Sequence, residues 1–426
     1  MKMGIENSGR TAANWLHWIE PWYLVYALLA VAAAGVIPVL LPLAVSQSGD
    51  AAEVGLVMAA VSLGGLSAPL WGVLTDRYRL HRWVLIIGLF LTTSGLAAFA
   101  FTARPFLWFL LALVMSIGIA GSSTVANLFV VEAHPEQEWD ERIGWLQTSY
   151  GLGQVLGLLF AGILSTIDLR TGLLATASLT GLAILLGWLT TRTLNLQSTR
   201  KPLLLHAARH AEGTIHSPQR SFHRVSLKGI REIGKVLRSR LGLFLITWFL
   251  AFAGSAAVFS QYPLLMEKVF RITPDISSTA FAIMAGLGLM LYTPSGRWSE
   301  HFGSARVLRV SMAIRLLAFM ILFVLGLVNL GSRSWLALLA FALVVLAWSL
   351  MSVSGTDLAA RLSTVGEGEG MGIFNAVTAL AGVIGAILGG WAAGNWGYDA
   401  SSIVAVTGLA LSLILSAVLV REESRK

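Results

Sequence analysis

Long apolar runs alternate with short polar connections along most of the chain. A helix rises about 1.5 Å per residue, so a run of about 20 to 25 apolar residues can cross the hydrocarbon core of a bilayer. Twelve such runs occur, at residues 22–46, 54–75, 83–103, 106–131, 143–167, 171–191, 241–266, 276–298, 307–330, 334–356, 370–394 and 400–420. The pattern therefore predicts an all-α integral membrane protein with twelve spans.

The composition favours the same class of protein. Charged residues make up 12% and apolar residues 56% of the 426 positions, against about 25% and about 45 to 50% in soluble proteins. The chain has no cysteine, which excludes disulfides, thiol catalysis and cysteine metal sites. The sequence also lacks a phosphate-binding loop, a zinc-spaced histidine pair and a nucleophile elbow. We therefore expect neither an enzyme nor a cofactor or metal site.

One long polar connection, residues 192–240, divides the apolar runs into two sets of six. We expect an N-terminal half at residues 1–191, a linker, and a C-terminal half at residues 241–426. Within the linker, apolar residues from Leu227 to Leu237 recur at helical spacing among basic residues. This pattern indicates either an amphipathic helix at the membrane surface or an extension of the seventh span.

The basic residues indicate how the chain is oriented. With both termini on the cytoplasmic side, 24 of the 30 Lys and Arg residues lie on that side, in agreement with the positive-inside rule. Topology thus accounts for the formal charge of +8, and we expect no nucleic-acid partner. We expect a monomer in the cell (inner) membrane, with both termini and the linker in the cytoplasm.

A short charged hairpin, residues 69–82, separates the second and third apolar runs. Its charges are expected at one membrane face, because unpaired charges inside hydrocarbon are costly. A related series follows in the second half of the chain, between the eighth and ninth runs. The two series are Gly72, Asp76, Arg77 and Arg82, and Gly296, Glu300 and Arg306. Such a repeat indicates a duplicated six-helix unit.

The first series resembles the loop between helices 2 and 3 of the major facilitator superfamily, which reads G-x-x-x-D-R-x-G-R-R. Arg79 stands where that family has its second glycine, and Gly303 restores the glycine in the second half. The resemblance implies twelve transmembrane helices in two six-helix halves, related by a pseudo-two-fold axis along the membrane normal. It also implies that the two series take part in gating. A plain topogenic loop is the alternative.

A glycine series on the fifth span resembles the signature G-x8-G-x3-G-P-x2-G-G of antiporter branches in the same superfamily. It departs from the signature at Leu158 and Ala161, where the family has proline and glycine, and a related series lies on the eleventh span. The glycines expected at helix contacts are Gly144, Gly153, Gly157, Gly162, Gly385, Gly389 and Gly390. The resemblance implies efflux, although close helix packing alone is also a sufficient reason for small residues.

In the superfamily, an acidic residue that ends helix 4 and an arginine that begins helix 5 pair with the helix 2–3 loop. Glu132 and Arg142 occupy these places, and Asp357 and Arg361 occupy similar places in the second half. The resemblance implies a latch at the cytoplasmic face whose state substrate binding can bias. Solvated loop charges are the alternative.

The resemblance places the walls of a substrate cavity on spans one, four, seven and ten, with additions from five, eight and eleven. The large polar and aromatic residues there are Tyr26, Asn127, Tyr150, Gln154, Trp248, Phe252, Gln261, Tyr262, Tyr292, Trp348 and Asn375. Such a wall suits an amphipathic or aromatic solute, although each aromatic residue fits ordinary packing as well. Arg315 is the only charge well inside a span. Because span nine lies outside the cavity in the superfamily, we favour a structural role for Arg315.

Together these features predict a secondary active transporter that moves a small-molecule substrate by alternating access, with proton-coupled efflux as the favoured activity. The spans that line the cavity carry no carboxylate near their middle. Protons are therefore expected to bind nearer the cytoplasmic face, at Glu132 and Asp357. The alternatives are an uptake symporter or facilitator for a sugar or an organic acid, and a receptor or assembly factor that does not transport.

Overall fold

The computed structural model describes residues 18–135, 138–193, 239–328, 334–363 and 367–423, and all regular structure within these ranges is helical. The helices are α1 (Tyr23–Ala30), α2 (Ile37–Ser46), α3 (Ala51–Gly64), α4 (Ala68–Tyr78), α5 (His81–Phe99), α6 (Pro105–Ala133), α7 (Trp139–Ile167), α8 (Leu169–Thr190), α11 (Arg240–Phe259), α12 (Tyr262–Lys268), α13 (Pro274–Phe302), α14 (Ser304–Val328), α15 (Ser334–Leu362), α16 (Glu367–Trp396) and α17 (Ala400–Glu423). The described chain contains twelve helical segments long and apolar enough to cross a membrane, which confirms the predicted spans. Most of the predicted linker, including its possible amphipathic helix, lies outside the described residues.

Three of the predicted spans differ in detail. The first consists of α1 and α2 joined by a π-helical turn, Val31–Val36, whose consecutive small residues let the backbone widen. The third ends at Phe99, short of the predicted residue 103. The seventh ends at Phe259, and the separate short helix α12 begins at Tyr262 with Pro263 in its first turn. Proline is common in the first turn of a helix, because the amides there have no acceptor within the helix and proline has no amide hydrogen.

At two helix starts, carboxylate side chains accept hydrogen bonds from backbone amides that have no partner within the helix. Asp50 accepts a hydrogen bond from the Glu53 amide at 2.8 Å, and the Glu53 carboxylate accepts one from the Asp50 amide at 3.0 Å. Asp168 caps α8 by accepting from the Thr171 amide at 2.8 Å. Both capping residues come directly before long apolar helices, and they therefore fix where α3 and α8 begin.

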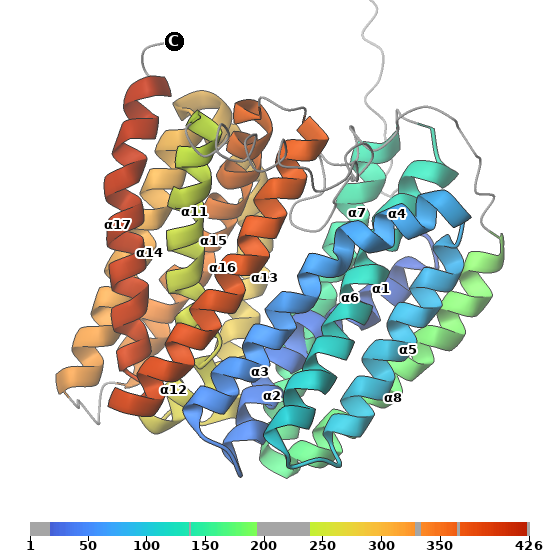
Figure 1. Cartoon of the computed structure of the whole chain (residues 1–426), viewed down its shortest axis with the longest axis horizontal. Coiled ribbons are helices and arrows are strands. Elements are labelled where there is room, and N and C mark those ends of the chain that lie inside the picture. Colours follow the sequence, from blue (N-terminus) through green and yellow to red (C-terminus); the bar gives the residue numbers. More distant parts are fainter. Residues whose placement is uncertain (1–17, 136–137, 194–238, 329–333, 364–366, 424–426) are drawn as a thin grey trace, which may run out of the picture.

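The spans form two bundles, one from α1 to α8 and one from α11 to α17 (Figure 1). Glycines bring the same pair of spans together in each bundle. A Cβ added to Gly157 in α7 would lie 2.4 Å from the Val31 carbonyl oxygen, and one added to Gly385 in α16 would lie 2.2 Å from the Ala253 oxygen. Because a Cβ would clash at these distances, the two helix backbones can come this close only where the residue is a glycine. The fifth span therefore packs on the first, and the eleventh packs on the seventh.

The two bundles meet along α3 with α16 and along α7 with α13. A Cβ on Gly390 would lie 2.7 Å from the Ala51 oxygen, and one on Gly162 would lie 3.2 Å from the Asp275 oxygen. These contacts are equivalent, because the two glycines occupy matching places in the two halves of the sequence, as do their two partners. The interface therefore follows the internal repeat of the sequence.

The halves separate toward the face where α1 begins and α17 ends, which we call the terminal face (Figure 1). Gly144, Gly296 and Gly372 lie near this face on α7, α13 and α16, and a Cβ on any of them would meet no described atom within 4 Å. Further along the same helices, Gly151 packs against Leu289 and Gly390 against Gly55. The halves are thus closed at the opposite face and open toward the terminal face.

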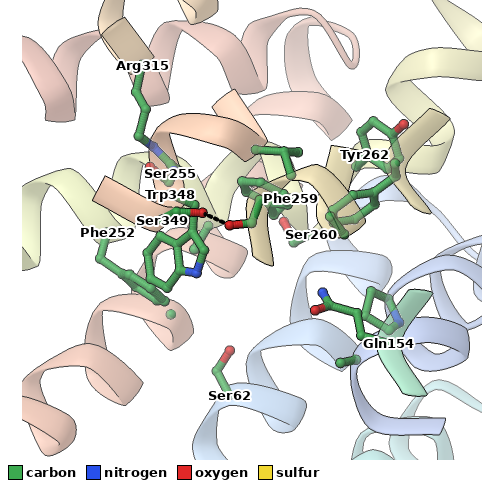
Figure 2. Close-up of a pocket in the computed structure, with 18 of the residues that line it drawn as sticks. Ser62, Gln154, Phe252, Ser255, Phe259, Ser260, Tyr262, Arg315, Trp348 and Ser349 are labelled. Atoms are coloured by element: carbon green, nitrogen blue, oxygen red, sulfur yellow. Dashed lines mark hydrogen bonds between the residues drawn. The ribbon is translucent and has the colours of Figure 1, made fainter. Parts of the chain in front are cut away.

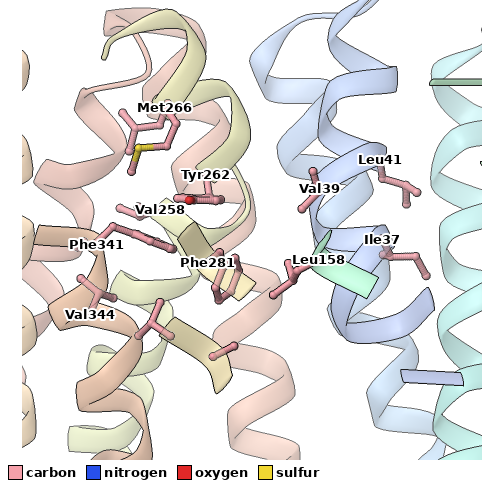
Figure 3. Packing of buried hydrophobic residues seen from close by; sticks show 14 of the residues in the cluster. Ile37, Val39, Leu41, Leu158, Val258, Tyr262, Met266, Phe281, Phe341 and Val344 are labelled. Atoms are coloured by element: carbon pink, nitrogen blue, oxygen red, sulfur yellow. The ribbon is translucent and has the colours of Figure 1, made fainter. Parts of the chain in front are cut away.

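Aromatic packing fills the C-terminal half near the closed end (Figure 3). The rings of Tyr262 and Phe341 stack with centroids 3.9 Å apart, and Phe281 meets Phe341 edge-on at 5.3 Å. The Tyr262 hydroxyl donates to the Ser277 carbonyl at 2.8 Å, so the buried polar atom has a partner. This cluster forms the floor on which a cavity between the halves rests.

Candidate functional site

A cavity of about 370 Å³ lies between the halves. Its lining is mostly apolar and aromatic, with a few hydroxyl and amide groups and one guanidinium (Figure 2). The residues are Ala34, Pro38, Met58, Ser62, Gln154, Phe252, Ser255, Ala256, Phe259, Ser260, Tyr262, Phe281, Ala285, Gly288, Leu289, Tyr292, Arg315, Val345, Trp348, Ser349, Gly382 and Ala386. A volume in this range fits a small organic molecule.

Each half supplies a different kind of wall. The N-terminal half contributes Ser62 from α3 and Gln154 from α7, whose polar groups lie across the cavity from the aromatic side (Figure 2). The C-terminal half supplies the aromatic residues of the lining, from α11, α12, α13 and α15, together with several hydroxyls and the guanidinium. A solute between the halves therefore meets two polar side chains on one side, and ring faces with further polar groups on the other.

The aromatic wall is held in place from behind. Phe252 and Trp348 lie with ring centroids 5.8 Å apart, and Trp248 stacks behind Phe252 at 6.2 Å. The Trp248 indole donates to the Thr378 hydroxyl at 2.8 Å. Fixed rings of this kind bind planar apolar groups with little loss of side-chain freedom.

Arg315 reaches this aromatic wall from α14 (Figure 2). Its side chain is 1% exposed, and its Nη1 donates to the Val344 carbonyl at 3.2 Å. Its guanidinium carbon lies 5.6 Å from the centre of the Trp348 ring and 5.7 Å from that of Phe259. The span of Arg315 lies at the outside of the half, yet its long side chain carries the charge to the cavity.

A second group of polar residues lies near the terminal face of the N-terminal half. The Glu20 carboxylate is 2.5 Å from His134 Nε2 and 3.0 Å from Arg142 Nη1, and it accepts from the Trp22 indole at 2.8 Å. Burial opposes ionisation of Glu20, but the hydrogen bonds from His134 and Trp22 and the charges of His134 and Arg142 lower its pKa below the usual range. This cluster ties the start of α1 to α6 and α7.

A separate pair joins α5 and α6 at the same face. Glu132 Oε1 lies 2.9 Å from His81 Nε2, and both side chains are largely buried. The pair therefore connects the start of α5, directly after the charged hairpin, to the end of α6.

The whole chain matches a known family. A model of the Major Facilitator Superfamily covers residues 22–367 and, in a second match, residues 243–426. The chain belongs to the Major Facilitator Superfamily. It is an integral membrane transporter with the twelve-helix fold of that family, in which two six-helix halves are related by a pseudo-two-fold axis along the membrane normal.

Two proteins with similar sequences bear names that mention different solutes. The tetracycline resistance protein, class C, of Escherichia coli is 25% identical over 358 residues, which are 83% of each chain. The probable anion transporter 4, chloroplastic, of Arabidopsis thaliana is 24% identical over 276 residues, which are 61% of this chain and 49% of that protein.

Solved structures of distant transporters share the fold. The nucleoside transporter NupG superposes with a TM-score of 0.73 at 13% identity, with 96% of this chain and 98% of that chain covered. A D-xylose-proton symporter superposes with a TM-score of 0.68 at 14% identity, with 94% and 97% covered. At these identities the likeness concerns the fold alone.

Five of the eleven predicted cavity residues line the cavity. They are Gln154, Phe252, Tyr262, Tyr292 and Trp348. The other six do not line it. They are Tyr26, Asn127, Tyr150, Trp248, Gln261 and Asn375.

The six residues outside the cavity contribute to packing in this structure. Tyr26 and Tyr150 contact each other with ring centroids 4.9 Å apart, and Asn127 accepts from Gln147 at 3.2 Å. Trp248 stands behind the aromatic wall, and Gln261 bonds to the backbone of the other half. The sequence indicates which span a residue belongs to, but not which face of the helix it occupies. It therefore could not distinguish these packing residues from the residues that line the cavity.

The sequence interpretation also missed part of the lining. Ser255, Ser349, Phe259 and Phe281 line the cavity, but small hydroxyls and single phenylalanines are common in any span. Arg315 did give a signal, as the only charge well inside a span, but its position on span nine favoured a structural interpretation. In the structure the span itself lies at the outside of the half, but the side chain of Arg315 reaches the lining.

The predicted gating residues of the first half do not all meet. The side chain of Asp76 lies outside the described part of the structure. Arg82 donates to the Trp188 carbonyl at 2.8 Å and lies over its ring, while Arg77 is exposed and lies over Tyr78. Thus the described contacts of Arg82 are with α8.

Glu132 and Arg142 contact different partners. Glu132 pairs with His81, which begins the helix after the charged hairpin, whereas Arg142 pairs with Glu20 and Glu138. Gly72 is a buried residue within α4. A gating role for these residues stays a prediction.

In the second half, Asp357 and Arg361 pair with each other at 2.8 Å along α15, and the Ser304 hydroxyl also donates to Asp357. Glu300 and Arg306 are exposed near the turn between α13 and α14. Gly296 packs against no described atom within 4 Å. These residues therefore gather at the terminal face, and their role in a latch also stays a prediction.

The glycine series has two kinds of members. Gly153 and Gly157 face the first span, Gly385 and Gly389 face α11, and Gly162 and Gly390 face the other half. Gly144 differs from the prediction, because a Cβ there would meet no described atom within 4 Å. It lies where the halves have separated, so it does not pack against a neighbouring helix in this state.

Proposed function

We propose that this transporter exports a small amphipathic or aromatic solute from the cytoplasm in exchange for protons. The observation that carries the proposal is the cavity, whose fixed aromatic wall faces a sparse set of polar groups. Solutes with many hydroxyl groups need a matching number of hydrogen-bond partners. Most hydroxyls of this lining already donate to backbone carbonyls, namely those of Ser62, Ser255, Ser260, Tyr262 and Ser349. The tetracycline resistance relative and the glycine series on α7 support export.

The proposal includes an orientation. The terminal face carries the charged hairpin at residues 69–82 and the ends of the spans next to the basic linker. By the positive-inside rule this face is cytoplasmic, and both termini lie on that side of the cell membrane. The described state is then open to the cytoplasm, as an exporter must be to load its solute.

The proton is proposed to bind near the cytoplasmic face. In the described part of the chain, none of the residues that line the cavity is an aspartate, a glutamate or a histidine. Glu132 and His81 form a largely buried carboxylate–imidazole pair between the end of α6 and the start of α5. Asp357 occupies the related place in α15 and is bonded to Ser304 and Arg361. Protonation of either carboxylate would weaken its contacts and so bias the gate.

The test is flux of tetracycline, an aromatic amphiphile, in liposomes with an imposed pH gradient. We expect tetracycline to move against the proton flow, and a protonophore to abolish its accumulation. Glu132→Gln keeps the shape of the side chain but cannot ionise. We expect it to lower the tetracycline accumulation that the pH gradient supports at equilibrium by about 5- to 150-fold, the usual range of coupling between two binding sites.

Glu267→Gln is the matched control, because Glu267 is a partly exposed carboxylate on the opposite face that pairs with Lys268. It should transport like the parent. Accumulation that ignores the pH gradient, with Glu132→Gln equal to the parent, would instead indicate a facilitator. A chain that carries D-xylose and no aromatic amphiphile would favour nutrient uptake.

A further inference from the structure

Among the described residues that line the cavity, Arg315 is the only one whose side chain carries a charge at neutral pH. An arginine stays protonated in proteins, even when it is buried. In the described part of the chain no carboxylate lies within 4 Å of its guanidinium nitrogens. The cavity therefore contains an uncompensated positive charge.

The protein satisfies little of the hydrogen-bonding capacity of this side chain. A guanidinium has five N–H donors, and the described structure gives one hydrogen bond, from Nη1 to the Val344 carbonyl at 3.2 Å. The Nε atom is buried and has no hydrogen-bond partner among the described residues. Buried donors without partners are uncommon, because they lose water and gain nothing in exchange.

The surroundings of Arg315 stabilise a cation only in part. Phe259, Phe319 and Trp348 present rings at 5.6 to 5.9 Å from the guanidinium carbon. Ring faces attract a cation, but they offer no acceptor to the N–H groups in its plane. The Ser255 and Ser349 hydroxyls, which line the same wall, donate to the carbonyls of Ala251 and Gly288 and supply no negative charge.

We infer that the cavity selects solutes with an acidic group, such as a carboxylate or an enolate, whose oxygen atoms take the open donors of Arg315. The aromatic or apolar body of the same solute then lies along Phe252 and Trp348, and Gln154 faces it from the other half. The inference rests on the proposed function, since it names the chemical class of the exported solute. An amphipathic organic anion satisfies both the charge and the rings.

A binding experiment tests this inference separately from transport. The probes are 1-naphthaleneacetate and 1-naphthaleneacetamide, which share an aromatic body and differ in charge. Binding is measured by calorimetry on the full chain in lipid nanodiscs, without a pH gradient. The parent should bind the acid about tenfold or more tightly than the amide, because hydrogen bonds to charged groups contribute about 1.5 to 3 kcal/mol.

Three variants test whether the guanidinium of Arg315 causes the preference for the acid over the amide. Arg315→Met removes the charge and should weaken binding of the acid about tenfold or more, so that the acid and the amide bind about equally well. Binding of the amide should fall much less, because its carbonyl oxygen carries no charge. Arg315→Lys keeps a charge on a shorter, non-planar group and should retain part of the preference. Arg309→Met, on the same helix but outside the lining, should behave like the parent.

Two outcomes would overturn the inference. The first is a parent that does not distinguish the acid from the amide, which includes a parent that binds neither. The second is an Arg315→Met protein that folds, as judged by its melting temperature, but loses both probes equally, since Arg315 would then be structural. Failure of the proposed function appears elsewhere, as an absence of gradient-driven tetracycline flux in a protein that still prefers the acid.

Discussion

At the scale of single residues, the turn between the second and third spans places an arginine in a backbone conformation that favours glycine. Arg79 ends α4 in the left-handed region, with φ of 54°, and Gly303 ends α13 with φ of 88°. The two residues occupy the same place in the repeat. A glycine reaches such φ values without steric cost, whereas other L-residues are strained there by about 1 to 2 kcal/mol.

We therefore expect Arg79→Gly to stabilise the protein. Relief of about 1 to 2 kcal/mol, less about 0.5 to 1 kcal/mol for the extra freedom of glycine when unfolded, leaves a net gain of up to about 1.5 kcal/mol. The measurement is the apparent melting temperature of the purified protein in detergent. Gly303→Ala is the matched reverse change and should lower it. A lower melting temperature for Arg79→Gly would show that the contacts of the arginine outweigh the strain.

At the scale of helices, the glycines of α16 differ in what surrounds them. A Cβ on Gly385 would lie 2.2 Å from the Ala253 carbonyl oxygen and 2.8 Å from the Ala256 Cβ in α11. A Cβ on Gly372, in the same helix, would meet no described atom within 4 Å. Helix α16 thus contains one glycine in close contact with another helix and one with free space around it. Replacement by alanine should change the stability of the protein in opposite directions at these two positions.

We expect Gly385→Ala to destabilise the protein by about 1 to 3 kcal/mol, because the added carbon overpacks a backbone contact. Gly372→Ala should stabilise it by about 0.5 to 1 kcal/mol, because alanine favours a helix over glycine. Thermal unfolding in detergent compares the two variants directly. Equal shifts in the same direction would mean that the α11–α16 contact adapts more easily than its distances suggest.

At the scale of the whole molecule, the two halves hold each other at the opposite face. The Gln261 side chain is fully buried and donates from Nε2 to the Ala51 carbonyl of the other half at 3.1 Å. Close beside it, Gly390 lets α16 approach Ala51 and Gly55 of α3. Opening at this face has to break these contacts, so they favour the state that is open toward the terminal face.

Gln261→Leu should therefore shift the transporter toward opening at the opposite face. Loss of one hydrogen bond removes about 0.5 to 1.5 kcal/mol from the closed arrangement, which changes the ratio of the two states about 2- to 13-fold. Since the chain has no cysteine, a single Ser62→Cys in the cavity reports access. A membrane-impermeant thiol reagent added at the opposite face should label it faster in Gln261→Leu.

Gln147→Leu provides the control, because Gln147 donates to Asn127 within one half at 3.2 Å. It removes a hydrogen bond of the same kind but crosses no boundary between the halves. Its labelling rate should match that of the parent. Faster labelling in both variants would mean that the change reports general loosening of the protein.

The membrane class, the number of spans and the repeat can all be read from the amino-acid sequence. Runs of apolar residues long enough for a bilayer are a local property, as are the charges between them, and both can be read along the chain. The matching glycines, such as Gly157 and Gly385, were also visible there, because equivalent helix contacts in the two halves need small residues at equivalent positions. Even the strained place of Arg79 could be found by comparison with Gly303.

Only the tertiary structure decided which side chains share the cavity. Trp248 and Trp348 both lie on spans predicted to line it, yet Trp348 faces the cavity and Trp248 stands behind it. Helix rotation and bending set that difference, and both depend on packing against other helices. Arg315 reaches the site from an outer span because its side chain is long. No carboxylate of the described residues pairs with Arg315. That fact depends on how the helices of both halves pack, and the position of one arginine in the sequence cannot reveal it.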